Sequence, residues 1–134
     1  ETQPIMSRLR SDLVDLCIAT LDGRLASVSA RWDSRAALGV VMAAGGYPAS
    51  YAKDKSIAGL NDCSFDNVKV FHAGTTLKGD VVRTSGGRVL CVVGLGETVS
   101  DARDKAYECV DNIHWDDVYF RRDIGHRAIA REAN

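Results

Sequence analysis

The chain has 134 residues, and its 17 lysines and arginines nearly balance its 18 aspartates and glutamates, which leaves a net charge of −1. This length suits a single domain or part of one, and a hydrophobic fraction of 46% is enough for a core. The near-zero charge, without a run of lysine or arginine, argues against a nucleic-acid-binding surface, and no stretch is long and apolar enough to cross a membrane.

The first predicted element is an amphipathic helix. Apolar residues recur at steps of three and four between residues 5 and 21, which is the period of one helical face. Thr2 is expected to cap this helix, Pro4 suits its first turn, and Gly23 is expected to end it. The recurring residues are Ile5, Leu9, Leu13, Leu16, Cys17 and Leu21.

A predicted central strand follows. Residues 24–33 alternate imperfectly and favour a short edge strand, whereas residues 36–44 are apolar throughout and predict a central strand. The segment Gly45-Gly46-Tyr47-Pro48 should end that strand in a sharp loop, because glycine permits positive φ and proline restricts the residue before it. Residues 49–67 are polar and irregular.

The next segments predict further strands. Residues 68–72 alternate and run into Gly74, and Lys78-Gly79-Asp80 predicts a hairpin turn with a partner strand at Val81 and Val82. Residues 89–93 are too short for a helix and predict a buried strand. The pair Gly86-Gly87 before it predicts either a hairpin turn or a backbone surface that faces a substrate.

The C-terminal third predicts a second amphipathic helix. Thr98 and Asp101 stand at capping positions, and apolar residues recur as far as Ile113. Residues 119–125 predict a last strand or edge segment, and residues 128–134 a fraying tail. The sum is an α+β fold: a mostly antiparallel sheet or partial barrel packed with two helices.

The residues alone do not predict a self-contained active site. The phosphate loop and the Gly-x-Ser-x-Gly elbow are absent, and Val99 breaks the dinucleotide fingerprint that Gly94-Leu95-Gly96 begins. Asp116-Asp117 is most simply an exposed loop, and His72 a structural histidine. Arg121-Arg122 could hold a phosphate by bidentate contacts or form a solvated strand edge, and both interpretations stay open.

Cysteine usage favours a reduced, cytoplasmic setting. The four cysteines form no Cys-x-x-Cys pair, and the three histidines do not stand at zinc spacing from them. Three of the cysteines sit in apolar runs and are expected to act as small core residues. A metal site built from this chain is therefore not expected.

Several strings resemble the phosphoribosylamine–glycine ligase (glycinamide ribonucleotide synthetase) family. In that family an Arg-Phe-Gly-Asp-Pro-Glu-x-Gln motif closes the ATP-grasp core, and this chain would begin at the motif's Glu. The strings run in the family's order over almost the whole chain. They are Glu1-Thr2-Gln3-Pro4, Arg8-Leu9-x-Ser11-Asp12-Leu13, Ala43-Ala44-Gly45-Gly46-Tyr47-Pro48, Val68–Thr75, Gly86–Leu90, Ala106-Tyr107 and Tyr119–Gly125.

This resemblance implies an enzyme of purine synthesis that joins glycine to 5-phosphoribosylamine with ATP, giving glycinamide ribonucleotide, ADP and phosphate. It implies that ATP, with Mg²⁺ or Mn²⁺, is bound by a region upstream of Glu1. Residues 1–23 would be the last helix of the ATP-grasp core and residues 24–134 the C-terminal domain. Because the chain opens without Met, we expect a piece of a longer polypeptide that is inactive alone and packs on the N-terminal and ATP-grasp domains of its own chain.

The resemblance also implies a substrate-side wall without catalytic residues. Its expected lining comprises Glu1, Gln3, Gly45, Gly46, Gly86, Gly87 and Arg88. Backbone amides at the glycine pairs suit anionic groups, and Arg88 could pair with a phosphate or carboxylate, or make a sheet-surface ion pair. The face of Leu9, Leu13 and Leu16 is the expected docking surface. Two alternatives are a non-catalytic binding module and the C-terminal domain of a related ATP-grasp carboxylase.

Overall fold

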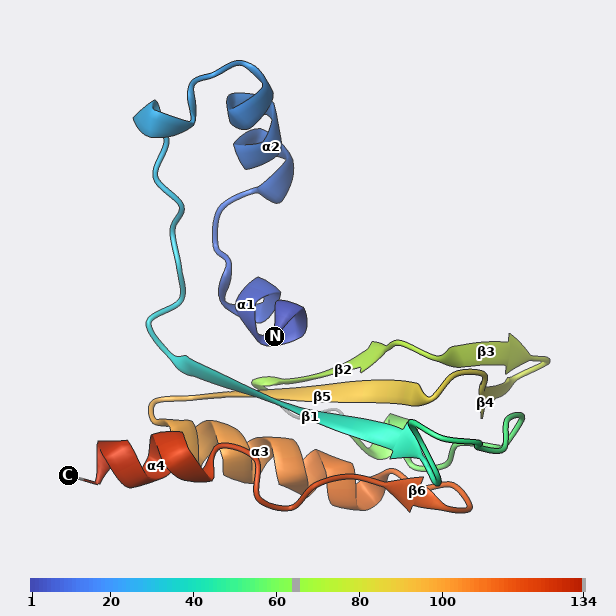
Figure 1. The fold of residues 1–134 in the computed structure, drawn as a ribbon. Helices are drawn as coiled ribbons and strands as arrows, with labels where there is room; N and C mark the ends of the chain where they lie inside the picture. Colours follow the sequence, from blue (N-terminus) through green and yellow to red (C-terminus); the bar gives the residue numbers. More distant parts are fainter. Residues whose placement is uncertain (64–65, 134) are drawn as a thin grey trace.

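The computed structural model describes residues 1–63 and 66–133. A four-stranded sheet lies between α1 on one face and the helices α3 and α4 on the other (Figure 1). The α-helices are α1 (Thr2–Arg8), α2 (Leu13–Leu21), α3 (Val99–Asn112) and α4 (His126–Glu132), with short 3-10 helices η1 (Leu25–Ser27) and η2 (Leu60–Asp62). The strands are β1 (Ala36–Ala44), β2 (Val68–His72), β3 (Thr75–Lys78), β4 (Val81–Thr84), β5 (Arg88–Gly96) and β6 (Val118–Tyr119).

The sheet has the strand order β2-β5-β1-β6, and every neighbouring pair is antiparallel. The strands β3 and β4 form a separate hairpin, whose turn contains the predicted Gly79 at φ +59°. The α+β class and the antiparallel sheet are confirmed. Of the two predicted alternatives, an antiparallel sheet and a partial barrel, the structure has the open sheet. The number of helices differs from the prediction, because the described residues contain four α-helices rather than two.

The core lies between the sheet and α3. Val40 and Met42 of β1 and Leu90 and Val92 of β5 are fully buried, and they pack against the apolar stripe of α3. The predicted central strand over 36–44 and the buried strand over 89–93 are both confirmed, although β5 extends to both sides of the predicted range. These two strands pair over almost their whole lengths, which makes them the centre of the fold.

Helix α3 begins and packs as its sequence predicts. The side chain of Thr98 accepts a hydrogen bond from the Asp101 amide at 3.0 Å, which satisfies one of the free donors of the first turn. Glycines of β5 allow the helix to lie directly on the strand. A Cβ atom on Gly94 would stand 2.9 Å from the Ala106 amide nitrogen, so only glycine leaves room for this approach.

The prediction of one continuous helix over 5–21 is wrong, because the segment forms two helices, α1 and α2. Between α1 and α2 the backbone pairs instead with residues near Asp33: the Arg10 amide donates to Arg31, and the Asp33 amide donates to Arg8. The carboxylate of Asp12 then accepts from the Val14 and Asp15 amides and starts α2 as a new helix. Thr2 is the first residue of α1 and not its cap.

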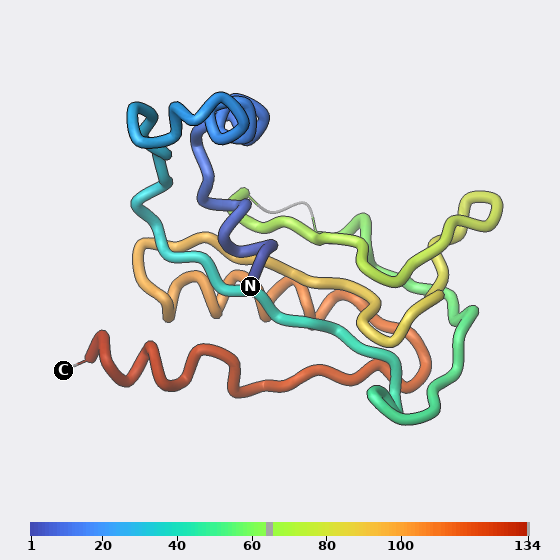
Figure 2. The backbone as a smooth tube through the Cα atoms, turned by 45° about the horizontal axis from the view of Figure 1, so that its top comes forward, coloured from blue at the N-terminus to red at the C-terminus, as the bar shows by residue number. Residues whose placement is uncertain are grey.

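The predicted edge strand over 24–33 is also wrong. This range contains η1 and a single antiparallel bridge from Trp32 to Leu9. Together with α2 it forms an arm, residues 9–35, that stands away from the sheet (Figures 1 and 2). The irregular stretch after β1 is confirmed apart from η2, and its residues 64–65 lie outside the described part.

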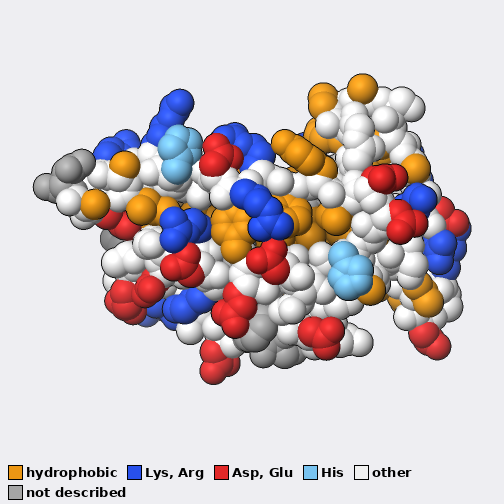
Figure 3. Space-filling model, turned by 90° about the horizontal axis from the view of Figure 1, so that it is seen from below, with side chains coloured by type: hydrophobic (Ala, Val, Ile, Leu, Met, Phe, Trp, Pro, Cys, Tyr) orange, Lys and Arg blue, Asp and Glu red, His pale blue; other side chains and the backbone are white. Residues whose placement is uncertain are grey.

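The C-terminus differs from the prediction as well. Only Val118 and Tyr119 form a strand, and residues 126–132 form α4 instead of a fraying tail. Gly125 enters this helix at φ +84°, and the Glu132 carboxylate accepts from the Val99 amide at 2.9 and 3.0 Å, which ties α4 to the start of α3. Charged side chains of both signs spread over this helical face (Figure 3).

A buried carboxylate holds the arm at its base. Asp33 accepts hydrogen bonds from the Arg35 side chain at 3.0 and 2.8 Å and pairs with Arg10, while Arg8 donates to the Asp33 carbonyl. The Arg35 side chain, then the Arg35 amide and Arg10, hold the pKa of Asp33 well below its ordinary value of 3.8.

We expect this contact to weaken in acid. Because the pKa of Asp33 is lowered on folding, its stabilisation is present above the unfolded pKa of about 4 and is lost as the pH falls further. Trp32 fluorescence, followed from about pH 6 to about pH 2 in a Trp115→Phe background, should report the release of the arm. Asp33→Asn should remove this transition, whereas Asp22→Asn, which changes an exposed pair on the arm, should keep it. An unchanged transition in Asp33→Asn would contradict the assignment.

Candidate functional site

The face of the sheet opposite α3 is only partly covered. Ala37, Gly39, Val41 and Ala43 of β1 alternate with the core residues and so point to this face. Helix α1 covers its middle, where a Cβ atom on Gly39 would stand 2.9 Å from Cγ of Pro4. Val41 stays exposed beside this helix, which leaves an open surface between α1 and the edge at β6.

The two glycine loops named by the sequence meet at this surface. The Ala44 amide donates to the Gly87 carbonyl at 2.8 Å, and the Tyr47 ring lies so close to Gly87 that a Cβ atom there would stand 2.6 Å from Cε2. Gly46 has φ +91°, which a residue with a side chain rarely adopts. The loops therefore carry Tyr47 across the end of β5.

Three predicted site residues come together in one pocket. A cavity of about 350 Å³ is lined by Glu1 and Gln3 of the α1 start and by Arg88 of β5. Arg88 is exposed, and its guanidinium has no hydrogen bond or ion pair within the described residues. The remaining lining residues are Thr2, Val41, Ala73, Leu90 and Cys91.

A second pocket of about 260 Å³ adjoins the first, because Val41 and Arg88 line both. Three aromatic residues help to line it: Tyr47 from the glycine loop, and Tyr119 and Phe120 from the segment that contains β6. The pair can therefore receive a ligand with an anionic group at Arg88 and an apolar or ring-shaped part beside it. The sequence prediction missed these aromatic residues, although Tyr47 stands within the predicted glycine loop.

The glycines serve close packing at several points. A Cβ atom on Gly45 would stand 2.6 Å from the Asp117 carbonyl, and Gly87 is buried under Tyr47. The sequence analysis expected free backbone amides at the glycine pairs. The Gly86 amide is not free, because it donates to the Gly74 carbonyl at 3.1 Å. Contact of the glycine pairs with a ligand stays a prediction.

The other sequence candidates are engaged in local contacts. His72 contacts Thr75 through Nδ1 at 2.9 Å, and Asp116 pairs with Lys55 at 3.5 Å. Cys91 lies on the floor of the Arg88 pocket, but burial raises the pKa of its thiol, which leaves it protonated and a weak nucleophile. Within residues 1–63 and 66–133 no three His, Cys, Asp or Glu side chains stand close enough together to hold a metal.

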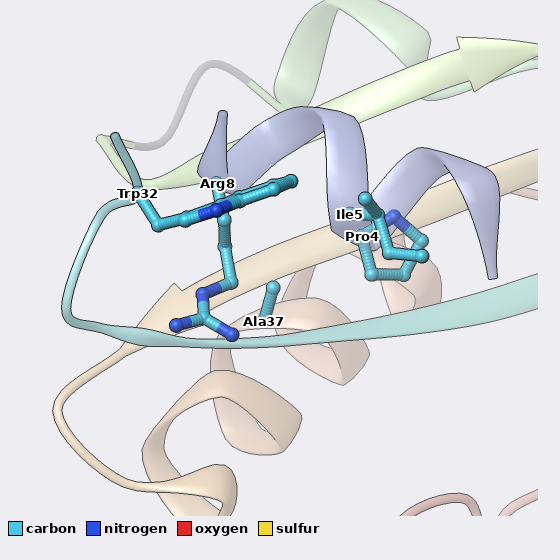
Figure 4. Close-up of a pocket in the computed structure, with 5 residues that line it drawn as sticks. All are labelled: Pro4, Ile5, Arg8, Trp32 and Ala37. Atoms are coloured by element: carbon cyan, nitrogen blue, oxygen red, sulfur yellow. The ribbon is translucent and has the colours of Figure 1, made fainter. Parts of the chain in front are cut away.

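A further cavity, of about 550 Å³, lies along α1. Figure 4 shows the residues that line it: Pro4, Ile5 and Arg8 come from α1, Ala37 from β1 and Trp32 from the arm. The Arg8 guanidinium is already bound to the Asp33 carbonyl at 3.0 and 3.2 Å, so the cavity offers mainly apolar surface. It suits contact with another part of a protein better than recognition of a charged ligand.

The fold and this surface define the class of protein: an α+β domain that presents an arginine pocket and a ring-sized aromatic pocket on an open sheet face. Comparison with known proteins names the family. Residues 37–127 match the model of the phosphoribosylglycinamide synthetase C domain. The chain belongs to this family, as the resemblance in its sequence predicted.

The relatives carry the same enzyme name. The chain is 59% identical over 132 residues to a phosphoribosylamine–glycine ligase of Allochromatium vinosum and 58% identical to one of Vibrio cholerae; both alignments cover 98% of this chain and 31% of the relative. A crystal structure of the Thermotoga maritima phosphoribosylamine–glycine ligase matches with a TM-score of 0.60 and 38% identity, over 72% of this chain and 22% of that one. The chain thus spans about a third of the length of the curated relatives it matches.

No helix in the described part of the chain is both long and apolar enough to span a membrane. All four cysteines are free thiols, with Cys63, Cys91 and Cys109 buried and Cys17 exposed. Cys91 and Cys109 therefore act as small core residues, as predicted. Cys17, which stands in an apolar run, is exposed instead, and Cys63 of the polar stretch is buried. Burial also raises the pKa values of the Cys63 and Cys109 thiols.

Proposed function

We propose that this chain is the C-terminal part of a ligase that joins 5-phosphoribosylamine and glycine with ATP, giving glycinamide ribonucleotide, ADP and phosphate in purine synthesis. Family membership and the enzyme name shared by relatives at 58–59% identity support this proposal. Its share of those relatives, 31%, favours a domain of the enzyme rather than the whole of it.

In this ligase the chain forms one wall of the substrate cleft. The observation that carries this role is the Arg88 guanidinium, which has no ion pair within the described residues and lines a pocket on the open sheet face together with Glu1 and Gln3. A guanidinium binds phosphate and carboxylate groups through two parallel hydrogen bonds, and both groups occur in the substrates. The neighbouring aromatic pocket is large enough to receive the ribose ring.

Nucleotide activation is assigned to the rest of the ligase. The described residues do not fit Mg²⁺ or Mn²⁺, since they contain no cluster of three carboxylate, histidine or cysteine side chains. ATP with its metal ion would therefore be bound by other domains of the same polypeptide. The free thiols are consistent with a cytoplasmic protein, which is also part of the proposal.

The arm is the proposed contact with those domains. On α2, Leu13 and Ile18 are each 47% exposed and Leu21 is 87% exposed, and this helix packs mainly against η1. An apolar surface of this kind on a short helix is stable in water only when a partner covers it. Residues 1–23 are proposed to belong with the ATP-grasp core, although α1 itself lies against β1 and β5.

The proposal is tested with the natural polypeptide that contains this sequence. Supplied with ATP, glycine and 5-phosphoribosylamine, it should form glycinamide ribonucleotide and ADP in equal amounts. Residues 1–134 alone should show no turnover. A polypeptide that instead consumes bicarbonate would be a related carboxylase, and one that binds ligands without turnover would be a binding module; either result would overturn the proposal.

The same assay tests the arm. Leu13→Lys with Ile18→Lys places two charges on an exposed helix face, so residues 1–134 should keep their circular dichroism spectrum. In the natural polypeptide the pair should lower ligase activity by about tenfold or more, because charge would enter an interdomain contact. Ala19→Lys, at the buried position of α2, is the contrasting variant and should disturb the arm itself. Full activity of the double variant would exclude this face as an interdomain contact.

A further inference from the structure

A third pocket lies where the chain turns from β6 into α4. It has a volume of about 420 Å³ and contains more arginine than any other pocket described above. Lys and Arg side chains gather beside a histidine at the α4 end of the molecule (Figure 3). The lining residues are Arg121, Asp123, Ile124, Gly125, His126, Arg127, Ala128 and Arg131.

Among the described residues, only one of these arginines forms an ion pair. Arg121 donates to both carboxylate oxygens of Asp123, at 2.9 and 2.6 Å, and this pair raises the pKa of Arg121 and lowers that of Asp123. Arg127 and Arg131 are exposed, and neither has an ion pair within the described residues. The pocket therefore carries an excess of positive charge.

The spacing of the two unpaired arginines is unfavourable for the helix itself. Arg127 and Arg131 are four residues apart on α4, so they lie on one face, where like charges destabilise a helix by about 0.2–0.5 kcal/mol. Helix α4 has only seven residues, so its stability is marginal and the repulsion lowers it further. A bound anion would reduce the repulsion between Arg127 and Arg131. Other surface arginines, such as Arg103, already have a carboxylate partner in the fold.

We propose that this pocket binds the phosphate of a small phosphorylated molecule through Arg127 and Arg131, with Arg121 at its rim. A phosphate carries close to two negative charges, which two guanidiniums can neutralise with bidentate hydrogen bonds. The site is small and local, and the chain as a whole has a net charge of −1, which favours a single phosphate group over a nucleic acid.

The pocket is continuous with the substrate surface. Arg121 and Ile124 line both this pocket and the aromatic pocket, which in turn shares Val41 and Arg88 with the first. A phosphorylated sugar could thus place its ring against Tyr47 and its phosphate near Arg121. That the phosphate is the 5-phosphate of 5-phosphoribosylamine rests on the proposed function; a separate phosphorylated effector is the other source of the same group.

The binding test uses inorganic phosphate and the natural polypeptide at low salt, with ³¹P NMR titration as the measurement. The double variant Arg127→Gln/Arg131→Gln should weaken phosphate binding by about tenfold or more, since it removes the charge-assisted hydrogen bonds. Arg127→Lys/Arg131→Lys should restore part of the affinity through charge alone. Arg122→Gln is the matched control, because Arg122 is adjacent but pairs with Asp111 outside the pocket.

Steady-state kinetics of the same variants separate the two sources. A KM for 5-phosphoribosylamine that rises about tenfold, with the KM values for ATP and glycine unchanged, identifies the substrate phosphate. If the glutamine variant loses phosphate binding but keeps its kinetics, the ligand is a separate phosphorylated molecule. The same conclusion follows if binding is lost in a polypeptide that has no ligase activity. Phosphate affinity that is the same in the glutamine variant and the natural protein, or absent from both, would overturn the site.

Discussion

Gly94→Ala is expected to destabilise this domain strongly, because Gly94 stands where β5 touches α3. The added Cβ atom would lie 2.9 Å from the Ala106 amide nitrogen and closer still to the Ala102 carbonyl oxygen, both of them backbone atoms of α3. The helix would have to move away from β5, and overpacking of this kind costs about 3 kcal/mol. Urea unfolding followed by circular dichroism measures the loss in free energy of unfolding.

Gly79→Ala is the matched control for Gly94→Ala. Gly79 also lacks a side chain, but it stands in the exposed β3–β4 turn with nothing within 4 Å of the added Cβ. Its φ of +59° makes alanine mildly strained there, at a cost of about 1 kcal/mol. Similar midpoints for the two variants would show that α3 does not depend on close contact at Gly94.

Arg88→Ala is expected to have the largest effect on function. In the natural polypeptide, loss of a charged hydrogen-bonding group to a substrate anion costs about 2 kcal/mol, which corresponds to roughly a thirtyfold fall in kcat/KM. Stability should change little, because the Arg88 side chain is exposed and makes no ion pair with the described residues. Ligase kinetics and thermal unfolding on the same samples distinguish the two effects.

Two further variants sharpen the Arg88 experiment. Arg88→Lys keeps the charge but not the bidentate geometry and should recover part of the activity. Arg103→Ala removes an exposed arginine of α3 that pairs with Asp104, away from the Arg88 pocket, and should leave the kinetics unchanged. Wild-type kinetics for Arg88→Ala would mean that Arg88 is only a surface residue of the sheet, the alternative that its sequence position left open.

Signals within short segments predicted the centre of the fold correctly. The apolar runs that became β1 and β5, the glycine turn between β3 and β4, and the Thr98 cap of α3 all depend on residues close together in sequence. The same holds for membership of the family, since its strings are read along the chain. Such elements can be predicted from their own residues, without knowledge of the distant segments that pack against them.

The elements that were predicted wrongly depend on partners distant in sequence. The helix over 5–21 is broken because residues 8–10 bond to residues 31–33, and α4 is ordered because Glu132 reaches the Val99 amide. Neither partner is visible in a local pattern of hydrophobicity. An isolated helix as short as α4 is also marginal in water, so its own sequence favours a frayed tail.

The candidate site divides in the same way. The residue types follow from the sequence: a guanidinium at Arg88, carboxylate and amide groups at Glu1 and Gln3, and glycine pairs that allow close backbone approach. The three-dimensional packing places the first three in one pocket, lets the Gly86 amide donate to the Gly74 carbonyl, and adds Tyr47 and Arg121 to the surface. The reason is that each residue's chemistry is fixed by its own side chain. The closeness of the site residues depends instead on the antiparallel pairing of β1 with β5 and on the packing of α1 across these strands.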